Sequence, residues 1–247
     1  MTSDYEETTD TPYPVCSDLS QIAGLLRKYG VCVIPGVFTR SECDSWMKEI
    51  LSNIEIISGN QKNHKRPDQW TEDKFPPQVR YGLFQNIFNN LKPVWQIRRD
   101  PRMKNIFKPV YSELRGAEVD DFVCSIDGIN IQPNISRYSG KKRDWANCDQ
   151  TTRDDVYKCV QGQAVLTNTE ACFRASPTSH KHFVEIMEAC KIPDTNRNFV
   201  KFNYRQLEKI IRDIVSPNNI PFQVLIKAKK RKCHSMVFDH CTFSNVF

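Results

Sequence analysis

The sequence lacks any apolar run of the roughly 20 residues needed to cross a bilayer. Its first ten residues are acidic and polar, whereas a secretory signal begins basic and continues apolar. None of the ten cysteines forms a CxxC pair, so the usual spacing of a structural zinc site is missing. These absences predict an intracellular protein with no membrane partner, whose thiols stay free in a reducing compartment.

The formal charge of +6 is distributed unevenly along the 247 residues. The first ten residues are acidic, and a basic run lies near the other end, at Lys227, Lys229, Lys230, Arg231 and Lys232. We therefore expect an acidic N-terminal arm over residues 1–15 and a single domain over 16–247 with a basic C-terminal segment. The basic run fits a nuclear-import signal or an assembly patch, and it fits a solvated turn before a strand equally well.

Helical periodicity dominates the first half of the chain. It predicts a helix over residues 18–29, with Gly30 at its C-cap, and a buried strand over 31–34. Thr39 or Ser41 can cap the next helix. Further helical patterns cover residues 83–91, 103–114, 179–190 and 204–215, whereas short apolar runs predict strands at 122–126, 129–131, 160–166, 224–226 and 236–238.

Four segments, taken in order, resemble the phytanoyl-CoA-dioxygenase-like family of Fe(II)/2-oxoglutarate oxygenases. They are residues 29–38 (YGVCVIPGVF), 144–150 (DWANCDQ), 160–166 (VQGQAVL) and 176–181 (SPTSHK). The resemblance implies an α+β fold, in which a helix-rich framework surrounds a double-stranded β-helix, or jelly-roll. It also implies that the jelly-roll is eroded and truncated at its C-terminal end, because the chain stops three residues after Ser244.

The metal site of that family is degenerate in this sequence. The family's His-x-Asp pair is replaced by Asn147-x-Asp149, and its distal histidine by Ser244. An amide oxygen is a poor donor to ferrous iron compared with an imidazole nitrogen. The arginine that binds 2-oxoglutarate in the family lies beyond its distal histidine and has no counterpart here. We therefore expect a pseudoenzyme without cofactor, with Asn147, Asp149 and Ser244 as vestigial ligand positions.

Other candidate residues have structural interpretations beside the functional ones. His180 matches a Ser-His turn that is structural in the family, so we expect a hydrogen-bonded residue of the fold. Cys233, His234, His240 and Cys241 could bind zinc, but neighbouring residues of a strand point to opposite faces. Basic residues around Trp95 could contact nucleic acid, although they equally suit a solvated helix end.

The predicted function is non-catalytic self-assembly. Opposite charges at the two ends favour contacts between copies, and Cys16, Cys233 and Cys241 are candidates for cross-linking once the protein meets an oxidising environment. This pattern resembles a viral occlusion-body protein, or polyhedrin, of the nudivirus kind. Such a protein would form a lattice with itself around virions in the host nucleus and would bind no specific nucleic acid. The alternatives are an oxygenase using Fe(II) and 2-oxoglutarate, and a pseudoenzyme that holds a small acid.

Overall fold

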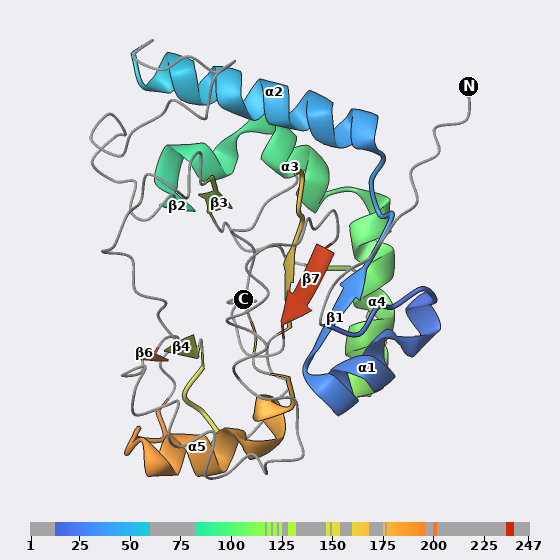
Figure 1. The fold of residues 1–247 in the computed structure, drawn as a ribbon, viewed down its shortest axis with the longest axis vertical. Helices are drawn as coiled ribbons and strands as arrows, with labels where there is room; N and C mark the ends of the chain where they lie inside the picture. The colour runs from blue at the N-terminus through green and yellow to red at the C-terminus, as the bar shows by residue number, and fades with distance from the viewer. Residues whose placement is uncertain are drawn as a thin grey trace. The chain divides into compact units, whose positions relative to one another are not determined.

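The computed structural model describes residues 13–59, 83–116, 118–119, 121–122, 124, 128–131, 147–148, 150–153, 160–167, 175, 177–195, 200–201 and 236–239 (Figure 1). The chain divides into two compact units. Unit 1 comprises Met1–Val37 and Ala146–Phe243, and unit 2 comprises Phe38–Trp145 and Ser244–Phe247. Two compact units can belong to one domain, so the single domain over 16–247 stays a prediction.

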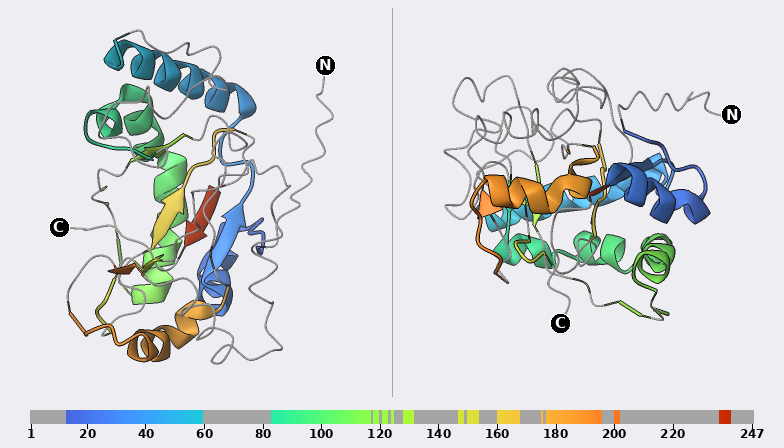
Figure 2. Two further views of the ribbon diagram at one scale, coloured as in Figure 1. Left: turned by 60° about the vertical axis from the view of Figure 1, so that its left-hand side comes forward. Right: turned by 90° about the horizontal axis from the view of Figure 1, so that it is seen from below.

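Unit 1 contains a three-stranded antiparallel sheet in the order β1-β7-β5. Its strands are β1 (Val31–Ile34), β7 (Met236–Asp239) and β5 (Gln161–Gln163). The three arrows lie side by side in the left view of Figure 2, although they come from distant parts of the chain. Cys32 and Gly162 both lie opposite Phe238 in the register. All four residues of β1 are buried, which explains its continuous apolar sequence.

The other edge of β1 is covered by the segment that precedes the first helix. Val15 forms a parallel bridge with Val33. The N–H of Cys16 donates to the Val33 carbonyl at 2.7 Å, and the N–H of Val33 donates to the Pro14 carbonyl at 2.9 Å. Residues 13–15, which the sequence placed in the acidic arm, therefore lie against the sheet of unit 1.

The first helix of unit 1 forms where periodicity predicts it. Asp18 caps a 3₁₀ turn, η1 (Leu19–Gln21), by accepting from the Ser20 N–H, and the turn continues into α1 (Ile22–Tyr29). Ile22, Ala23 and Leu26 are buried on one face. Gly30 ends the helix in the left-handed conformation, with φ of 76°, and its N–H donates to the Leu26 carbonyl.

The remaining described elements of unit 1 are short. η6 (Ser179–His182) continues into α5 (Phe183–Ala189), whose buried residues are Phe183, Ile186 and Met187. β4 (Asn147–Cys148) pairs antiparallel with β6 (Val200–Lys201). β4 and β6 therefore form a second, two-stranded sheet.

The longest helix of unit 2 is α2 (Arg40–Ile57), which begins at a capping box. The Thr39 side chain accepts from the Glu42 N–H, and the Glu42 carboxylate accepts from the Thr39 N–H. The apolar face of α2 buries Cys43, Ile50, Leu51 and Ile54. The helix packs against α3 (Lys92–Arg98) in the same unit.

Unit 2 also contains a 3₁₀ helix, a further α-helix and a small two-stranded sheet. β2 (Leu83–Phe84) pairs with β3 (Ile129–Asn130), and η4 (Asn86–Asn90) leads into α3. α4 (Pro101–Arg115) is capped by Asp100 and ends at Gly116. Phe84 and Phe88 are fully buried and make an edge-to-face contact with ring centroids 5.1 Å apart.

The sequence predicted the long elements correctly and the short ones less well. Helices at 18–29, 103–114 and 179–190 and the strand at 31–34 are confirmed within a few residues. The helical prediction for 83–91 is confirmed only in part, because Asn86–Asn90 form a 3₁₀ helix and Leu83–Phe84 form β2. The strand expected at 160–166 is only Gln161–Gln163. Residues 204–215 and 224–226 lie outside the described residues, so the jelly-roll stays a prediction. Within the described residues, no helix is long and apolar enough to span a bilayer.

Candidate functional site

Of the three predicted vestigial ligand positions, the structure describes one, Asn147 in the strand β4 of unit 1. Asn147 opens β4 and lies opposite Lys201 in the register, and the next residue, Cys148, is buried. Asp149 and Ser244, the other two predicted positions, lie outside the described residues. The structure therefore places only Asn147, by its backbone.

The loop after β4 is fixed by polar contacts to the segment that follows α5. The hydroxyl of Thr151 donates to the Thr195 carbonyl. The guanidinium of Arg153 donates through Nη2 to the Ile192 carbonyl at 2.6 Å and lies 3.8 Å from Asp194. The Arg153 side chain is only 14% exposed, so these contacts tie the chain directly after β4 to the segment that follows α5.

Metal binding is not tested by the described side chains. Among the described residues, no three histidine, cysteine, aspartate or glutamate side chains are grouped closely enough to hold an ion. The candidates from the sequence that could contribute to such a group lie outside that part of the chain, namely Asp149, Cys233, His234, His240 and Cys241. The predicted absence of a cofactor stays a prediction.

His180 packs on the corner between α1 and β1. The side chain is 4% exposed, and its Nε2 lies 3.0 Å from the Arg27 carbonyl oxygen. Beside it, the N–H of Thr178 donates to the Tyr29 carbonyl at 2.7 Å. Burial is the main cause that lowers the pKa of His180 below its usual value. The prediction that His180 is a hydrogen-bonded residue of the fold is confirmed.

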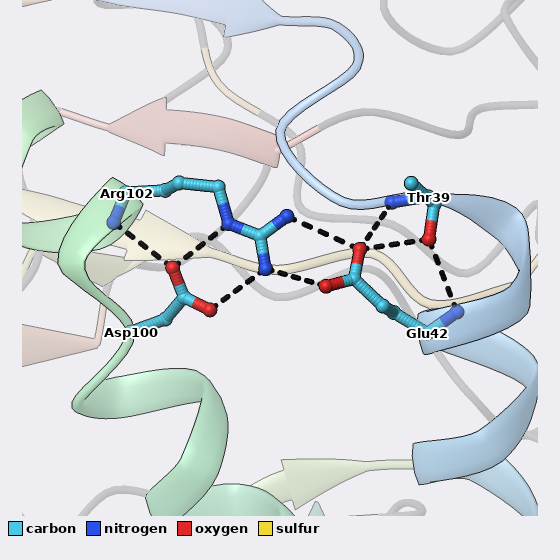
Figure 3. A network of polar contacts seen from close by, with 4 residues as sticks. All are labelled: Thr39, Glu42, Asp100 and Arg102. Atoms are coloured by element: carbon cyan, nitrogen blue, oxygen red, sulfur yellow. Dashed lines mark hydrogen bonds and ion pairs between the residues drawn. The ribbon is translucent and has the colours of Figure 1, made fainter.

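A network of charged residues joins the N-termini of α2 and α4 in unit 2 (Figure 3). The Arg102 guanidinium donates to both oxygens of Glu42, at 2.7 and 3.1 Å, and to both oxygens of Asp100, at 2.8 Å each. It also lies over the ring of Phe38, 4.7 Å from the centroid. Arg102 therefore links two helix-capping groups, the Glu42 of the capping box and the N-cap Asp100, through paired hydrogen bonds.

Hydrogen bonds from Arg102, followed by those from Thr39, lower the pKa of Glu42 to about 2. Because the pKa is lower in the folded state, this carboxylate stabilises the protein above its ordinary pKa. The stabilisation is lost as pH falls from about 4.5 through about 2. We expect Glu42→Gln to lower the free energy of unfolding at pH 7 by about 1 kcal/mol, because the network is partly exposed and water screens it.

The matched control is Asp44→Asn, since Asp44 pairs with Arg40 one turn apart on the same helix with both side chains more than half exposed. It should cost less than about 0.5 kcal/mol. Denaturant unfolding at pH 7 and pH 3 measures both variants. If Glu42→Gln and the unaltered chain differed by the same free energy of unfolding at pH 7 and at pH 3, the lowered pKa of Glu42 would be contradicted.

The cysteines that the structure describes are mostly buried. Cys16, a predicted cross-linking residue, is 1% exposed, and burial raises its pKa. Burial also raises the pKa of Cys32 to about 12. A cross-link through Cys16 therefore requires residues 13–16 to leave the edge of β1. Cys124 is exposed, whereas Cys233 and Cys241 lie outside the described residues.

Basic side chains near Trp95 are engaged within unit 2. Arg98 lies over the Trp95 ring, 5.2 Å from the centroid, and donates to the Asn89 carbonyl at 2.8 Å. Arg102 belongs to the carboxylate network described above. These contacts favour the structural interpretation over nucleic-acid binding. The basic run of Lys227, Lys229, Lys230, Arg231 and Lys232 lies outside the described residues.

Sequence reasoning missed the connection between Arg102 and Glu42, which are 60 positions apart. The local signal was present at each end: a Thr-x-x-Glu capping pattern at residues 39–42 and Asp100 directly before Pro101. Nothing in the sequence indicates that one arginine joins the two caps.

Comparison with known proteins gives a partial similarity. No protein-family model matches the chain, and no solved structure matches it. The chain is similar to the Ava biosynthesis cluster protein O of Aspergillus versicolor, with 30% identity over 115 residues. That alignment covers 46% of this chain and 33% of the fungal protein. The chain thus matches about a third of the length of this curated relative, which does not establish a family.

Proposed function

We propose that the chain is a non-catalytic structural protein that assembles with copies of itself on a degenerate oxygenase-like scaffold. The observation that carries the proposal is that, within unit 1, two of the segments that resemble the family pair with a common strand while a ligand position of the family is altered. β1 and β5, from two of the four segments that resemble the family, both pair with β7, and the Ser-His turn of a third packs beside β1. These pairings support a retained scaffold, whereas Asn147 stands where the family has its first imidazole.

Assembly is supported by two features of the sequence, the uneven distribution of charge and the number of cysteines. The acidic residues before position 13 and the basic run at 227–232 offer opposite charges to neighbouring copies. Cys16, Cys233 and Cys241 are the candidates for cross-linking after release into an oxidising environment, Cys16 only once residues 13–16 leave the edge of β1. In its most specific form, the proposal is an occlusion-body protein of the polyhedrin kind, formed in a host nucleus around virions.

The proposal is tested by offering the purified protein Fe(II) and 2-oxoglutarate under anaerobic conditions and then admitting oxygen. We expect no stoichiometric iron and no succinate release. In light scattering, the protein should form large particles that become smaller when reductant is added or when the pH is made alkaline. Stoichiometric iron together with succinate release would overturn the proposal.

A variant with Asn147→His and Ser244→His provides the positive control. It restores the residue types of the family at both altered ligand positions and leaves Asp149 in place. Iron binding that appears only in this variant would support loss of the ligands as the cause of inactivity. Iron binding by the unaltered chain would contradict it.

A second candidate function is an enzyme or small-acid-binding protein of a biosynthetic pathway. It is favoured by the name of the similar fungal protein, which belongs to a biosynthesis cluster. Such a protein would stay monodisperse at high concentration and would bind 2-oxoglutarate or a related acid in calorimetry. A dispersed monomer that binds this acid would favour the second candidate over assembly.

A further inference from the structure

The turn that contains His180 is held on the corner between α1 and β1 by three kinds of contact. The Thr178 N–H donates to the Tyr29 carbonyl, and the imidazole of His180 reaches the Arg27 carbonyl. The ring also packs so tightly on Gly30 that a β-carbon there would lie 2.4 Å from Nδ1. The turn at residues 178–182 thus depends on one buried imidazole that fits a site without a side chain.

The hydrogen bond fixes which nitrogen carries the proton in the neutral ring. A carbonyl oxygen only accepts, so Nε2, at 3.0 Å from the Arg27 carbonyl, must be the donor. A second proton therefore has to be added at Nδ1. That atom is the one closest to the Gly30 backbone position, in a packed and buried environment.

The surrounding charges oppose the second proton. Four basic side chains lie on α1 and on the turn that contains His180. They are Arg27 and Lys28 at the end of α1, and Lys181 and His182 in the turn. Burial lowers the pKa of His180, the hydrogen bond to the Arg27 carbonyl partly offsets this, and the charges of Lys181 and His182 lower the pKa further. Glu185 pairs with His182, at 2.6 Å.

The turn also carries strain that favours release. Thr178 has a φ of 69°, in the left-handed region that a β-branched residue rarely adopts. Such a conformation costs about 1 kcal/mol or more and persists only where surrounding contacts hold it. Here the hydrogen bond to the Tyr29 carbonyl and the docking of His180 provide those contacts.

We propose that His180 is an acid-sensitive latch: protonation of its imidazole in a mildly acidic environment releases residues 178–182 from the corner between α1 and β1. The latch is a property of the fold of unit 1 and holds whether the protein assembles or catalyses. It gives the protein a way to open this corner on entering an acidic compartment, without proteolysis or reduction.

The direction and size of the change in the released population follow from the linkage between protonation of His180 and release of the turn. The folded state binds the proton less well than the released state, so the contribution of His180 is fully present above the ordinary histidine pKa and is lost as pH falls below it. With an ordinary pKa of about 6.5 in the released turn, the released population should rise between pH 7.5 and pH 5.5, by at most about tenfold.

The test is amide hydrogen exchange of the full chain at pH 7.5 and pH 5.5, with each rate corrected for the intrinsic exchange rate at that pH. Protection of the Thr178 amide and of residues 179–182 should fall at the lower pH, by at most about tenfold. In His180→Gln the amide can still donate to the Arg27 carbonyl but cannot titrate, so protection should be the same at both pH values.

His182→Gln is the matched control, because His182 is a neighbouring and more exposed histidine of the same turn. It removes one of the charges that oppose protonation of His180 but keeps that imidazole, so protection should still fall at pH 5.5. A loss at pH 5.5 that persists in His180→Gln, or no loss in the unaltered chain, would overturn the proposal. If His180→Gln does not fold, NMR titration of the unaltered chain decides: a His180 pKa at or above the ordinary value would refute the latch.

Discussion

Replacing Gly30 by alanine is expected to lower the free energy of unfolding of unit 1 by about 3 kcal/mol. Two costs combine at this position. The residue has a φ of 76°, which L side chains rarely adopt, and its β-carbon would lie 2.4 Å from Nδ1 and 3.0 Å from Cγ of His180. The ring cannot move away without weakening its hydrogen bond to the Arg27 carbonyl.

Gly116→Ala separates the two costs. Gly116 ends α4 with a φ of 64°, as Gly30 ends α1, but no atom of the described residues lies within 4 Å of the position of its β-carbon. This control should cost about 1 kcal/mol, the price of the backbone conformation alone. Amide exchange of residues 22–34 and 178–190 measures the change in unit 1, and amide exchange of residues 101–115 measures the change that the control causes in unit 2. Equal losses in the two variants would show that His180 does not pack on Gly30 as described.

The contact between Gly30 and His180 also shows what the sequence could and could not predict. Gly30 was predicted as a C-cap because it directly follows a periodic apolar stretch, which is a local signal. The structural role of His180 was predicted from the Ser-His turn. Their contact was not, because 150 positions separate them and periodicity carries no information about which turn packs on which corner.

Short elements were harder to predict for a related physical reason. α3 has 7 residues, and its start is marked by Pro93 and not by a side-chain cap, so too few turns repeat to give a clear period. β5 is a 3-residue strand whose partner β7 lies more than 70 positions away. Its extent is set by that pairing, so the apolar run at 160–166 overestimates it.

In the candidate site, too, the sequence predicts residue types but not contacts between distant segments. Residue types at positions 147, 149 and 244 can be read directly from the sequence, and they are the basis for expecting a pseudoenzyme. The burial of Cys16 could not be read in this way, because it results from the bridge between Val15 and Val33. The paired carboxylates on Arg102 likewise depend on how α2 and α4 are placed within unit 2.

Replacing Phe88 by alanine should give a comparably large loss in unit 2, about 3–5 kcal/mol. Phe88 is fully buried, and its ring makes an edge-to-face contact with the equally buried Phe84. Truncation removes both the transfer free energy of the ring and the aromatic contact, and it leaves a cavity because Phe84 can fill only part of the space. Tryptophan fluorescence during denaturant unfolding measures the loss, since all four tryptophans lie in the sequence of unit 2.

Ile87→Ala is the control for this prediction, because Ile87 is the preceding residue of the same 3₁₀ helix and is 54% exposed. It should change the free energy of unfolding by less than about 0.5 kcal/mol. Since both variants shorten an apolar side chain in η4, a difference between them reports burial and not the propensity of the helix. If both variants lost the same small amount, Phe88 would not be part of a packed core, and the pairing of β2 with β3 beside it would need another source of stability.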